Sequence, residues 1–547
     1  MLFFKKNYKR NLFIIAPSDN FNTDIPYLSM PILAGQLKGA GYDVICRDFS
    51  NEIFHDFNDK KFIDKILEKN IDFIKRTKKN QNIKLELNYQ KYNYIINSID
   101  KKEININFKR QLYDFVRYSY NYGKYNLNYE SLKNLCYDEN ANFFITYFNE
   151  KIKKLPKNVN KIFLSMYPGY EIYPILTLAR MLKEQYKNAK IILGGYWFVY
   201  IKEEIQKHPD FFDLFCDYLI AGEGEISILE LMKFLEKEID ISEVSNLMYS
   251  SSNKVIINSD KIDIDINKLY YANYDDTDFS KYSQHSTVTM QLSRGCYWGK
   301  CKFCTYRNKN NFQLKTISNA INEIKYYVDK YNVKYINFVD DAIHPNYYYR
   351  LSQELLKQNI KIKFSSFAIF DNEFNPEVLN KCAEAGLDII TWGLETNSKK
   401  VFDIANKSGC FEKRAEIIKN AHNAGIKNCI NIIESLPGEQ LEDLIQTIKF
   451  LYDNVNYIYD FYIQPFQQRV GSEFSLNPQL YGLKNINKED FSLYYNFKNT
   501  NTDINKSNSF FSFMNNYKFS EDSTYTAQEE LRILTKEYLK FQAPHLL

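Results

Sequence analysis

The feature that most constrains this chain is a loop that places Cys296, Cys301 and Cys304 within nine residues. The loop directly follows residues 287–292, a strand-like run. Structural zinc takes four protein ligands, and no fourth Cys or His lies near these three in the sequence. A cubane iron–sulfur cluster held by three thiolates keeps one iron open for a small chelating ligand. The spacing therefore favours a 4Fe–4S cluster, with a zinc-bound or incidental group of thiols as the alternative.

The residues beside the cysteines suit a bound cluster. Gly295 and Gly299 have no Cβ, so the loop can wrap closely around an inorganic group. Phe303, directly before the last cysteine, supplies an apolar wall. We therefore expect the three thiols to be metal ligands and Phe303 to belong to a cofactor site.

At these residues the chain resembles the radical S-adenosylmethionine (SAM) enzymes. Their hallmark is a three-cysteine loop after the first strand of a partial β/α barrel, with an aromatic residue before the last cysteine. Four residues separate the first two cysteines here, where the family commonly has three. Variant spacings occur in the branch that also carries a cobalamin-binding-like domain. The resemblance implies that SAM chelates the open iron and that one electron from the cluster cleaves it to a 5′-deoxyadenosyl radical.

The sequence around and after the cysteine loop keeps a strand–helix rhythm from about residue 286 to residue 478. Six such units fit a partial (β/α)6 barrel of the TIM type, whose active-site loops follow the carboxyl ends of the strands. The expected strands are residues 287–292, 335–339, 362–367, 389–395, 428–434 and 459–463.

Polar residues at these strand ends are candidate SAM ligands. Asp340 and Asp341 end the second strand, where the family places groups that face the amino end of SAM; a plain acidic turn is the alternative. Glu395, in the segment Gly-Leu-Glu-Thr, resembles a family strand-end pattern whose polar side chain reaches the cofactor. Residues 432–438 resemble the segment that flanks the adenine, and the residues at 469–472 resemble a loop that closes the barrel mouth. These two segments contribute Pro437, Gly438 and Arg469, the last with a surface salt bridge as its alternative.

The amino-terminal half predicts a Rossmann- or flavodoxin-like α/β domain. Apolar runs at residues 11–16, 42–46, 161–165, 190–193 and 218–220 read as parallel strands, interrupted by a mostly helical insertion at about 51–157. Open α/β sheets bind ligands at the carboxyl ends of their strands. The candidate binding residues there are Ser165, Gly194, Gly195, Gly222 and Glu223.

Taken in order, these signals resemble the cobalamin-binding-like domain that precedes many radical SAM barrels. The family's cobalt-ligating pattern, Asp-x-His-x-x-Gly, is missing, and His55 and His208 are the only histidines of this half. We therefore expect cobalamin to bind without a protein histidine ligand, or else the domain to have lost cobalamin. The expected domains are 1–238, a connector at 239–285 that contains a hairpin, the barrel at 286–478 and an α-rich extension at 479–547.

Composition narrows the class of protein. A chain of 547 residues is too long for one core, and its net charge of +4 argues against a dedicated nucleic-acid binder. The nine cysteines are scattered apart from the triad, which indicates a reducing compartment. The start has no signal-peptide pattern, and no apolar stretch of about twenty residues is present. We expect a soluble cytoplasmic protein.

The resemblance implies methyl transfer to an unactivated carbon, or related C–H functionalisation, on a peptide or natural-product substrate. It also implies an electron donor such as flavodoxin or ferredoxin. One alternative is a cobalamin-free radical SAM enzyme that performs cross-linking, epimerisation or another hydrogen abstraction. Another is a non-catalytic, metal-bound scaffold. The insertion and the extension have no counterpart in the resemblance, so the sequence leaves the substrate open.

Overall fold

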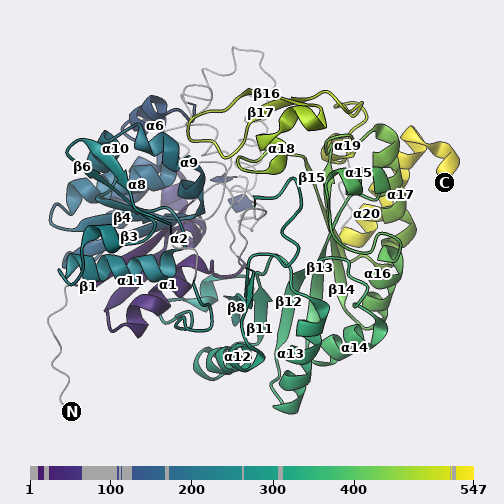
Figure 1. Cartoon of the computed structure of the whole chain (residues 1–547), viewed down its shortest axis with the longest axis horizontal. Coiled ribbons are helices and arrows are strands. Elements are labelled where there is room, and N and C mark those ends of the chain that lie inside the picture. The colour runs from purple at the N-terminus through teal and green to yellow at the C-terminus, as the bar shows by residue number, and fades with distance from the viewer. Residues whose placement is uncertain are drawn as a thin grey trace. The chain divides into compact units, whose positions relative to one another are not determined.

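The computed structural model divides the chain into two compact units, each described here by itself (Figure 1). Unit 1 comprises Met1–Ile264, Leu269–His285 and Glu489–Leu493, and unit 2 comprises Asp265–Lys268, Ser286–Lys488 and Tyr494–Leu547. The structure describes residues 10–17, 24–64, 108–109, 112–113, 126–166, 172–260, 264–305, 312–517, 519 and 525–547.

Unit 1 is built on a seven-stranded sheet with the order β2-β1-β3-β4-β5-β6-β7. The first five strands are parallel, and the hairpin predicted in the connector joins the sheet as β6 and β7, which are antiparallel. The order 2-1-3-4-5 is that of a flavodoxin-like sheet, whose direction of winding reverses between β1 and β3. The strands are β1 (Arg10–Ala16), β2 (Val44–Asp48), β3 (Val159–Met166), β4 (Lys190–Gly194), β5 (Tyr218–Ile220), β6 (Leu247–Ser251) and β7 (Lys254–Ile257).

Both faces of this sheet are covered, as its continuous apolar strands predict. Phe13 and Ile15 share a buried cluster with side chains of α1 (Ser29–Gly39) and α11 (Gly224–Leu235). Leu12 and Ile14 alternate with them and are fully buried as well. The other helices are α2 (Phe49–Asp56), α6 (Tyr129–Leu135), α7 (Phe143–Ile152), α8 (Tyr173–Gln185), α9 (Tyr196–Gln206) and α10 (Asp210–Leu214).

The predicted insertion is helical wherever it forms regular structure in the described residues, through α2, α6 and α7. These helices form where aromatic side chains can be buried together. Phe49, for example, packs on Tyr147 and Phe148 of α7, with ring centroids 6.5 and 6.2 Å away. Most of residues 65–125 lies outside the described residues, so the rest of the insertion stays a prediction.

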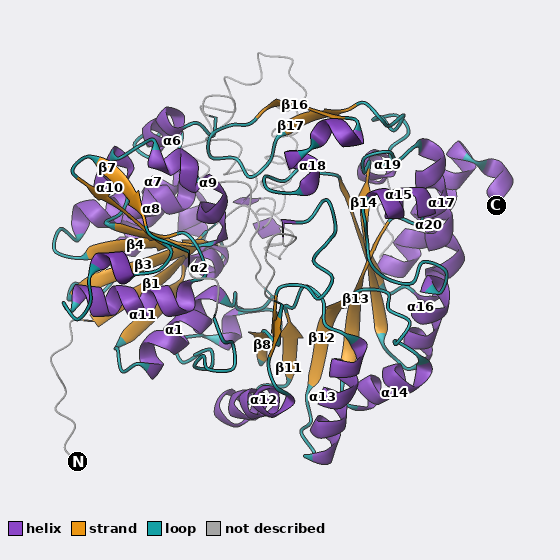
Figure 2. Cartoon of the chain, in the orientation of Figure 1, coloured by secondary structure: helices purple, strands orange, loops and turns teal. Residues whose placement is uncertain are grey.

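Unit 2 contains the six-stranded parallel sheet that the sequence predicts, in the order β15-β14-β13-β12-β11-β8 (Figure 2). Each strand of this sheet pairs in parallel with the strand of the sheet that follows it in the sequence, so the carboxyl ends of all six strands lie on the same side. The arrangement is that of a partial barrel whose first and last strands are β8 and β15. The strands are β8 (Thr287–Met290), β11 (Tyr335–Phe338), β12 (Lys363–Ala368), β13 (Leu387–Glu395), β14 (Lys427–Glu434) and β15 (Asp460–Pro465). The connecting helices are α12 (Ile317–Tyr331), α13 (Pro345–Lys357), α14 (Pro376–Glu384), α15 (Lys399–Ile404), α16 (Arg414–Asn423) and α17 (Leu441–Asn454).

The carboxyl-terminal segment holds more structure than its sequence suggests. The longest helix of this segment is α20 (Ala527–Gln542). The segment also forms elements that are too short for a periodic signal. These are the antiparallel pair β16 (Leu483–Asn487) and β17 (Asn496–Asn499), and α19 (Phe510–Asn516); the short helix α18 (Glu473–Leu476) lies just before the segment.

Within the described parts of the chain, no helix combines the length and apolar character needed to cross a bilayer.

Candidate cluster and cofactor site

The three-cysteine loop leaves the carboxyl end of β8 and turns back along the sheet edge. At the two ends of the loop lie the short strands β9 (Ser293–Arg294) and β10 (Gln313–Leu314), which pair with each other in antiparallel fashion. Cys296 forms a parallel bridge with Ala342, which follows β11. Gly295 and Gly299 have φ angles of +79° and +60°, a region that glycine enters without strain. The backbone at both positions therefore has a conformation that glycine adopts more easily than other residues.

Asp340 holds the start of the loop in place. Its carboxylate accepts hydrogen bonds from the backbone N–H of Leu292 at 2.9 Å and from the N–H and hydroxyl of Ser293. The side chain is buried, and this desolvation raises its pKa to about 7 despite the three donors. The structure thus uses Asp340 to orient the loop, while the neighbouring Asp341 is exposed. A contact of either carboxylate with SAM stays a prediction.

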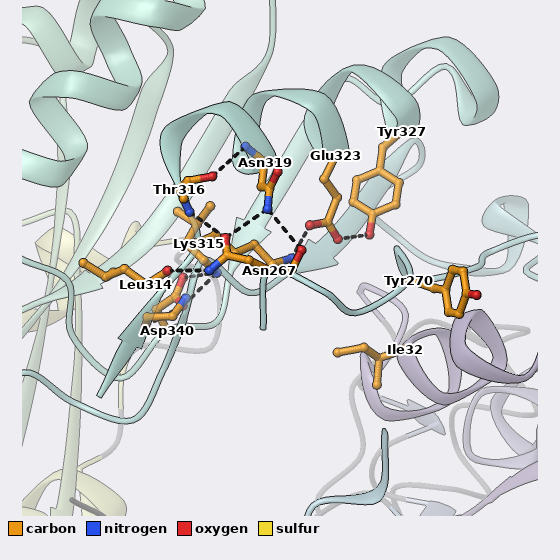
Figure 3. Close-up of polar contacts among 12 residues, drawn as sticks. Ile32, Asn267, Tyr270, Leu314, Lys315, Thr316, Asn319, Glu323, Tyr327 and Asp340 are labelled. Carbon is orange, nitrogen blue, oxygen red and sulfur yellow. Dashed lines mark hydrogen bonds and ion pairs between the residues drawn. The ribbon is translucent and has the colours of Figure 1, made fainter. Parts of the chain in front are cut away.

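A polar network fixes the chain where it returns from the loop through β10 (Figure 3). Asn267 donates from its amide to the carbonyl of Leu314 at 3.2 Å and accepts from the N–H of Thr316 at 2.8 Å. Next to it, Lys315 forms an ion pair with the buried Glu323. Since β10 pairs with β9, this network also holds the amino-terminal end of the cysteine loop.

The spacing of the thiols suits a cluster better than a single ion. In the described parts of the chain, the only three donor atoms of His, Cys, Asp or Glu that lie within 4.8 Å of one another are those of His344, Asp371 and Glu373. At least one pair of sulfurs among the three loop cysteines is therefore more than 4.8 Å apart. Sulfurs bound to one zinc ion at about 2.3 Å would lie roughly 3.8 Å apart. This donor set fits a multi-iron cluster, which spreads its thiolates over several metal atoms.

Glu395 and Lys407 form a buried ion pair beside the thiols. The Glu395 Oε1 and Lys407 Nζ atoms are 2.9 Å apart, and both side chains are about nine-tenths buried. Burial lowers the pKa of Lys407, but the negative charges of Glu395 and Cys301 outweigh it and hold the pKa above its ordinary value. Burial raises the pKa of the Cys301 thiol to about 12, against the opposing effect of Lys407. The sequence singled out Glu395 but not Lys407, because only the fold brings that lysine to the strand end.

The segment after β14 forms a tight loop at the same edge. Ser435 has a φ of +64°, and its N–H and that of Leu436 donate to the Glu439 carboxylate. Desolvation raises the pKa of the buried Glu439 to about 8. Gly438 has a φ of +84°, and a Cβ there would lie 2.7 Å from the Ile404 side chain. Pro437 and Gly438 therefore lie in the tight loop after β14, and their place beside the adenine of SAM stays a prediction.

The carboxyl-terminal segment packs on the cysteine loop. Phe303, Tyr481 and Phe497 all pack against one apolar cluster that includes Phe466 and Phe474. The N–H of Phe474 donates to the carbonyl of Lys302 at 3.1 Å. The Phe303 side chain thus forms part of an apolar wall, as predicted, but the partners that complete the wall were not foreseen.

Arg469 lies in the loop after β15. The backbones of Arg469 and Tyr494 form an isolated antiparallel β-bridge, and the Arg469 guanidinium lies 5.8 Å from the centre of the Tyr494 ring. The loop thereby connects the barrel end to the carboxyl-terminal segment of unit 2. Whether Arg469 reaches SAM remains a prediction.

In unit 1 the predicted crevice residues gather at the carboxyl edge of the sheet. Ser165 is the next-to-last residue of β3 and follows Leu164, which pairs with Leu193 of β4. A Cβ on Gly195 would lie 3.6 Å from the Ser165 hydroxyl. A Cβ on Gly194 would meet only the Ile220 carbonyl, also at 3.6 Å. Gly222 differs, because a Cβ there would lie 2.5 Å from the Asn246 side chain.

Glu223 and the two histidines of this half have identifiable contacts. The Glu223 carbonyl accepts from the Asn246 amide at 3.0 Å, at the start of α11. His55 Nε2 lies 2.7 Å from the carbonyl of Lys281. The His208 ring stacks on Tyr129 with centroids 3.9 Å apart. The expectation that neither histidine ligates cobalt stays a prediction.

Comparison with curated proteins finds distant relatives. A protein of Pyrococcus horikoshii named as an uncharacterized methyltransferase is 23% identical over 313 residues, which cover 55% of this chain and 65% of that protein. The anaerobic magnesium-protoporphyrin IX monomethyl ester cyclase of Synechocystis is 22% identical over 303 residues, which cover 54% and 60%. The matches thus span less than two thirds of either relative.

Solved structures share the fold over most of the chain. The cobalamin-dependent SAM radical enzyme OxsB, with aqua-cobalamin and SAM bound, matches 92% of this chain and 65% of its own with a TM-score of 0.59 and 15% identity. The radical SAM methyltransferase TsrM of Kitasatospora setae matches 88% and 79% with a TM-score of 0.57 and 11% identity. This likeness confirms the predicted α/β architecture of an amino-terminal cobalamin-binding-like fold followed by a partial barrel.

The family model of the radical SAM superfamily matches residues 290–451. The match begins at the end of β8, includes the three cysteines and runs into α17, so it covers most of the six-stranded sheet and the loop at its edge. Residues 290–451 of this chain belong to the radical SAM superfamily.

Proposed function

We propose that this chain is a radical SAM enzyme in which Cys296, Cys301 and Cys304 hold a 4Fe–4S cluster. The observation that carries the proposal is the meeting of the cysteine loop with the buried Glu395–Lys407 pair at the carboxyl edge of one parallel sheet. When bound, the cluster supplies the electron that cleaves SAM and yields a radical able to abstract hydrogen from a substrate.

The side chains at this edge can bind and orient SAM. The Glu395 carboxylate can accept charge-assisted hydrogen bonds from the ammonium group of SAM, and Asp341, after β11, can serve as a second acceptor. Lys407 balances the negative charge of the thiolates. Pro437 and Gly438 can flank the adenine, and the apolar wall around Phe303 excludes water from the cluster.

The proposed reaction is cobalamin-dependent methyl transfer, or related C–H functionalisation, on a peptide or natural product. Support comes from the flavodoxin-like order of the unit 1 sheet, whose carboxyl edge carries small residues where a large planar ligand can approach. OxsB and TsrM, which share the fold, were solved with cobalamin. Because His55 and His208 have other partners, the lower cobalt face is proposed to receive no protein histidine.

A cobalamin-free radical enzyme is the second candidate. The observation in its favour is the close packing of Asn246 against Gly222, which fills part of the edge that a corrinoid would use. For either candidate we propose flavodoxin or ferredoxin as the electron donor. We also propose a reducing cytoplasm as its location, since the nine cysteines are scattered along the sequence apart from the loop triad.

Anaerobic reconstitution tests the proposal. The protein should bind about four irons per chain and release 5′-deoxyadenosine from SAM on reduction. Replacing Cys296, Cys301 and Cys304 together by Ala should abolish both. The matched control is Cys410→Ala, a partly buried cysteine of the same unit, which should keep both. Full iron content and activity in the triple variant would show that the cluster is held elsewhere or is absent.

A further inference from the structure

Glu395 lies at the centre of a strained turn at the end of β13. Its φ is +59°, and the N–H of Thr396 donates to the carbonyl of Leu394 at 2.7 Å, which closes a γ-turn around it. The pairing of β13 with β14 shifts register between Gly393 and Glu395. Positive-φ γ-turns are rare and strained, and such a conformation persists only where the surroundings hold it. The turn therefore needs partners that fix the residues next to it.

Two side chains hold the residues after the turn. Arg414 donates from its Nη1 atom to the carbonyl of Thr396 at 2.8 Å. The N–H of Asn397 donates to the hydroxyl of Thr447 at 2.9 Å. These contacts orient the peptide units on the carboxyl side of Glu395, so they limit the directions in which its carboxylate can point.

Arg414 is an unexpected residue for its surroundings. It is 1% exposed and lies among aromatic rings, with its guanidinium 4.7 Å from the centre of Phe402 and 4.5 Å from that of Phe411. Its Nε atom has no hydrogen-bond partner among the described residues. An apolar side chain of similar size often serves stability as well as a buried charge or better. The two aromatic rings attract the guanidinium as well, but only the hydrogen bond to the Thr396 carbonyl connects it to the turn.

We propose that Arg414 is a positioning residue for SAM binding, which holds the γ-turn through the Thr396 carbonyl and keeps the Glu395 carboxylate beside Lys407. This inference rests on the proposed function, because it assigns Arg414 a task only if Glu395 receives SAM. Arg414 acts through Glu395 and itself contacts no substrate.

A double-mutant cycle tests the inference on the reconstituted protein. Arg414→Met should raise the Kd for SAM about tenfold at unchanged iron content, and Arg414→Lys, which keeps a donor, should fall between it and wild type. In the Glu395→Gln background, Arg414→Met should change the Kd less than twofold, because the group it positions is already lost. Arg532→Met is the control, since that arginine is exposed and donates to the Asn456 side chain instead of to the turn.

Thr447→Val supplies a second route should Arg414→Met fail to fold. It keeps the shape of Thr447 but removes the acceptor for Asn397, and its effect on the Kd should likewise vanish in the Glu395→Gln background. Wild-type affinity in Arg414→Met, or effects that multiply with Glu395→Gln, would overturn the inference alone. Failure of the reconstituted wild-type protein to bind SAM would overturn the proposed function and the inference together.

Discussion

At the scale of single residues, the site depends on a glycine as much as on charged groups. A Cβ at Gly393 would lie 2.7 Å from both Glu395 Oε1 and Lys407 Nζ, so the ion pair lies directly over this residue. Both atoms end long side chains, which can move aside without disturbing the backbone. The space above Gly393 therefore fixes the position of the pair more than it contributes to folding.

We expect Gly393→Ala to weaken SAM binding several-fold while the melting temperature changes little. The methyl group displaces the ends of the Glu395 and Lys407 side chains, which separates the carboxylate from its place beside the thiols. For comparison, Glu395→Gln removes the charge and should weaken SAM binding by roughly 1.5–3 kcal/mol, the range for hydrogen bonds to charged groups. Equilibrium binding gives the Kd for SAM of both variants, and thermal unfolding gives their melting temperatures. An unchanged Kd in both would place SAM away from the pair.

The sequence identifies only part of this site. Glu395 stands out because it is polar at the end of an apolar strand. Lys407 is 12 residues away from Glu395, and Arg414 is 18 residues away from Thr396, so no local pattern connects them. Their contacts arise because α15 and the loop after it return to the carboxyl end of β13. Contacts of this kind come from the packing of elements, which spacing in one sequence does not encode.

At the scale of elements, the loop between β14 and α17 is held by its own carboxylate. Glu439 accepts hydrogen bonds from two backbone N–H groups of the loop and is buried, and desolvation raises its pKa to about 8. The carboxyl-terminal segment adds further support, since the Asn499 amide donates to the Ser435 carbonyl at 3.2 Å. The stability of this loop should therefore respond to the protonation of Glu439.

We expect the stability difference between wild type and Glu439→Gln to depend on pH. A glutamate whose pKa is raised from 4.5 to about 8 in the folded state stabilises the fold fully below pH 4.5 and loses this contribution as the pH rises to 8. Relative to Glu439→Gln, the wild type should thus lose up to about 1.4 kcal/mol per pH unit across this window and stay level above it. Denaturant unfolding of both proteins at several pH values measures the difference. A constant difference would mean that Glu439 is ionised in the fold.

Elements with a strong repeating pattern were predictable, and short ones were not. In α12, Ile321 and Ile324 share one buried face, and this helical spacing is visible in the sequence. β16 and β17 have only five and four residues, and most of their side chains are exposed or half-buried. Their position depends on Phe497 packing against the cluster around Phe466, a contact that the sequence pattern does not show.

At the scale of the whole molecule, the order of strands in each unit follows from the order of elements in the sequence. Alternating strands and helices predict parallel sheets, and right-handed crossovers leave few possible orders. The sequence did not show that the hairpin β6–β7 would extend the first sheet, because antiparallel pairing on β5 depends on an available edge. Nor did it show that residues 489–493 would pack in unit 1, where the Phe491 carbonyl accepts from the Trp197 indole at 2.9 Å.

The two units should respond separately to substitution at the unit 1 edge. If cobalamin binds there, protein refolded with hydroxocobalamin should retain it, and His55→Ala and His208→Ala should leave the bound spectrum unchanged. Gly194→Phe should abolish retention, because the phenyl ring would fill the edge between β4 and Ser165. Gly194 is a better position than Gly195, because the φ of +132° at Gly195 would strain any larger residue, whereas a Cβ on Gly194 makes only an ordinary contact at 3.6 Å.

Iron content and SAM cleavage should survive in Gly194→Phe, since the cysteines lie in unit 2. Wild-type protein that elutes free of corrinoid would favour the cobalamin-free radical enzyme, and corrinoid retention by Gly194→Phe would move the binding site away from this edge.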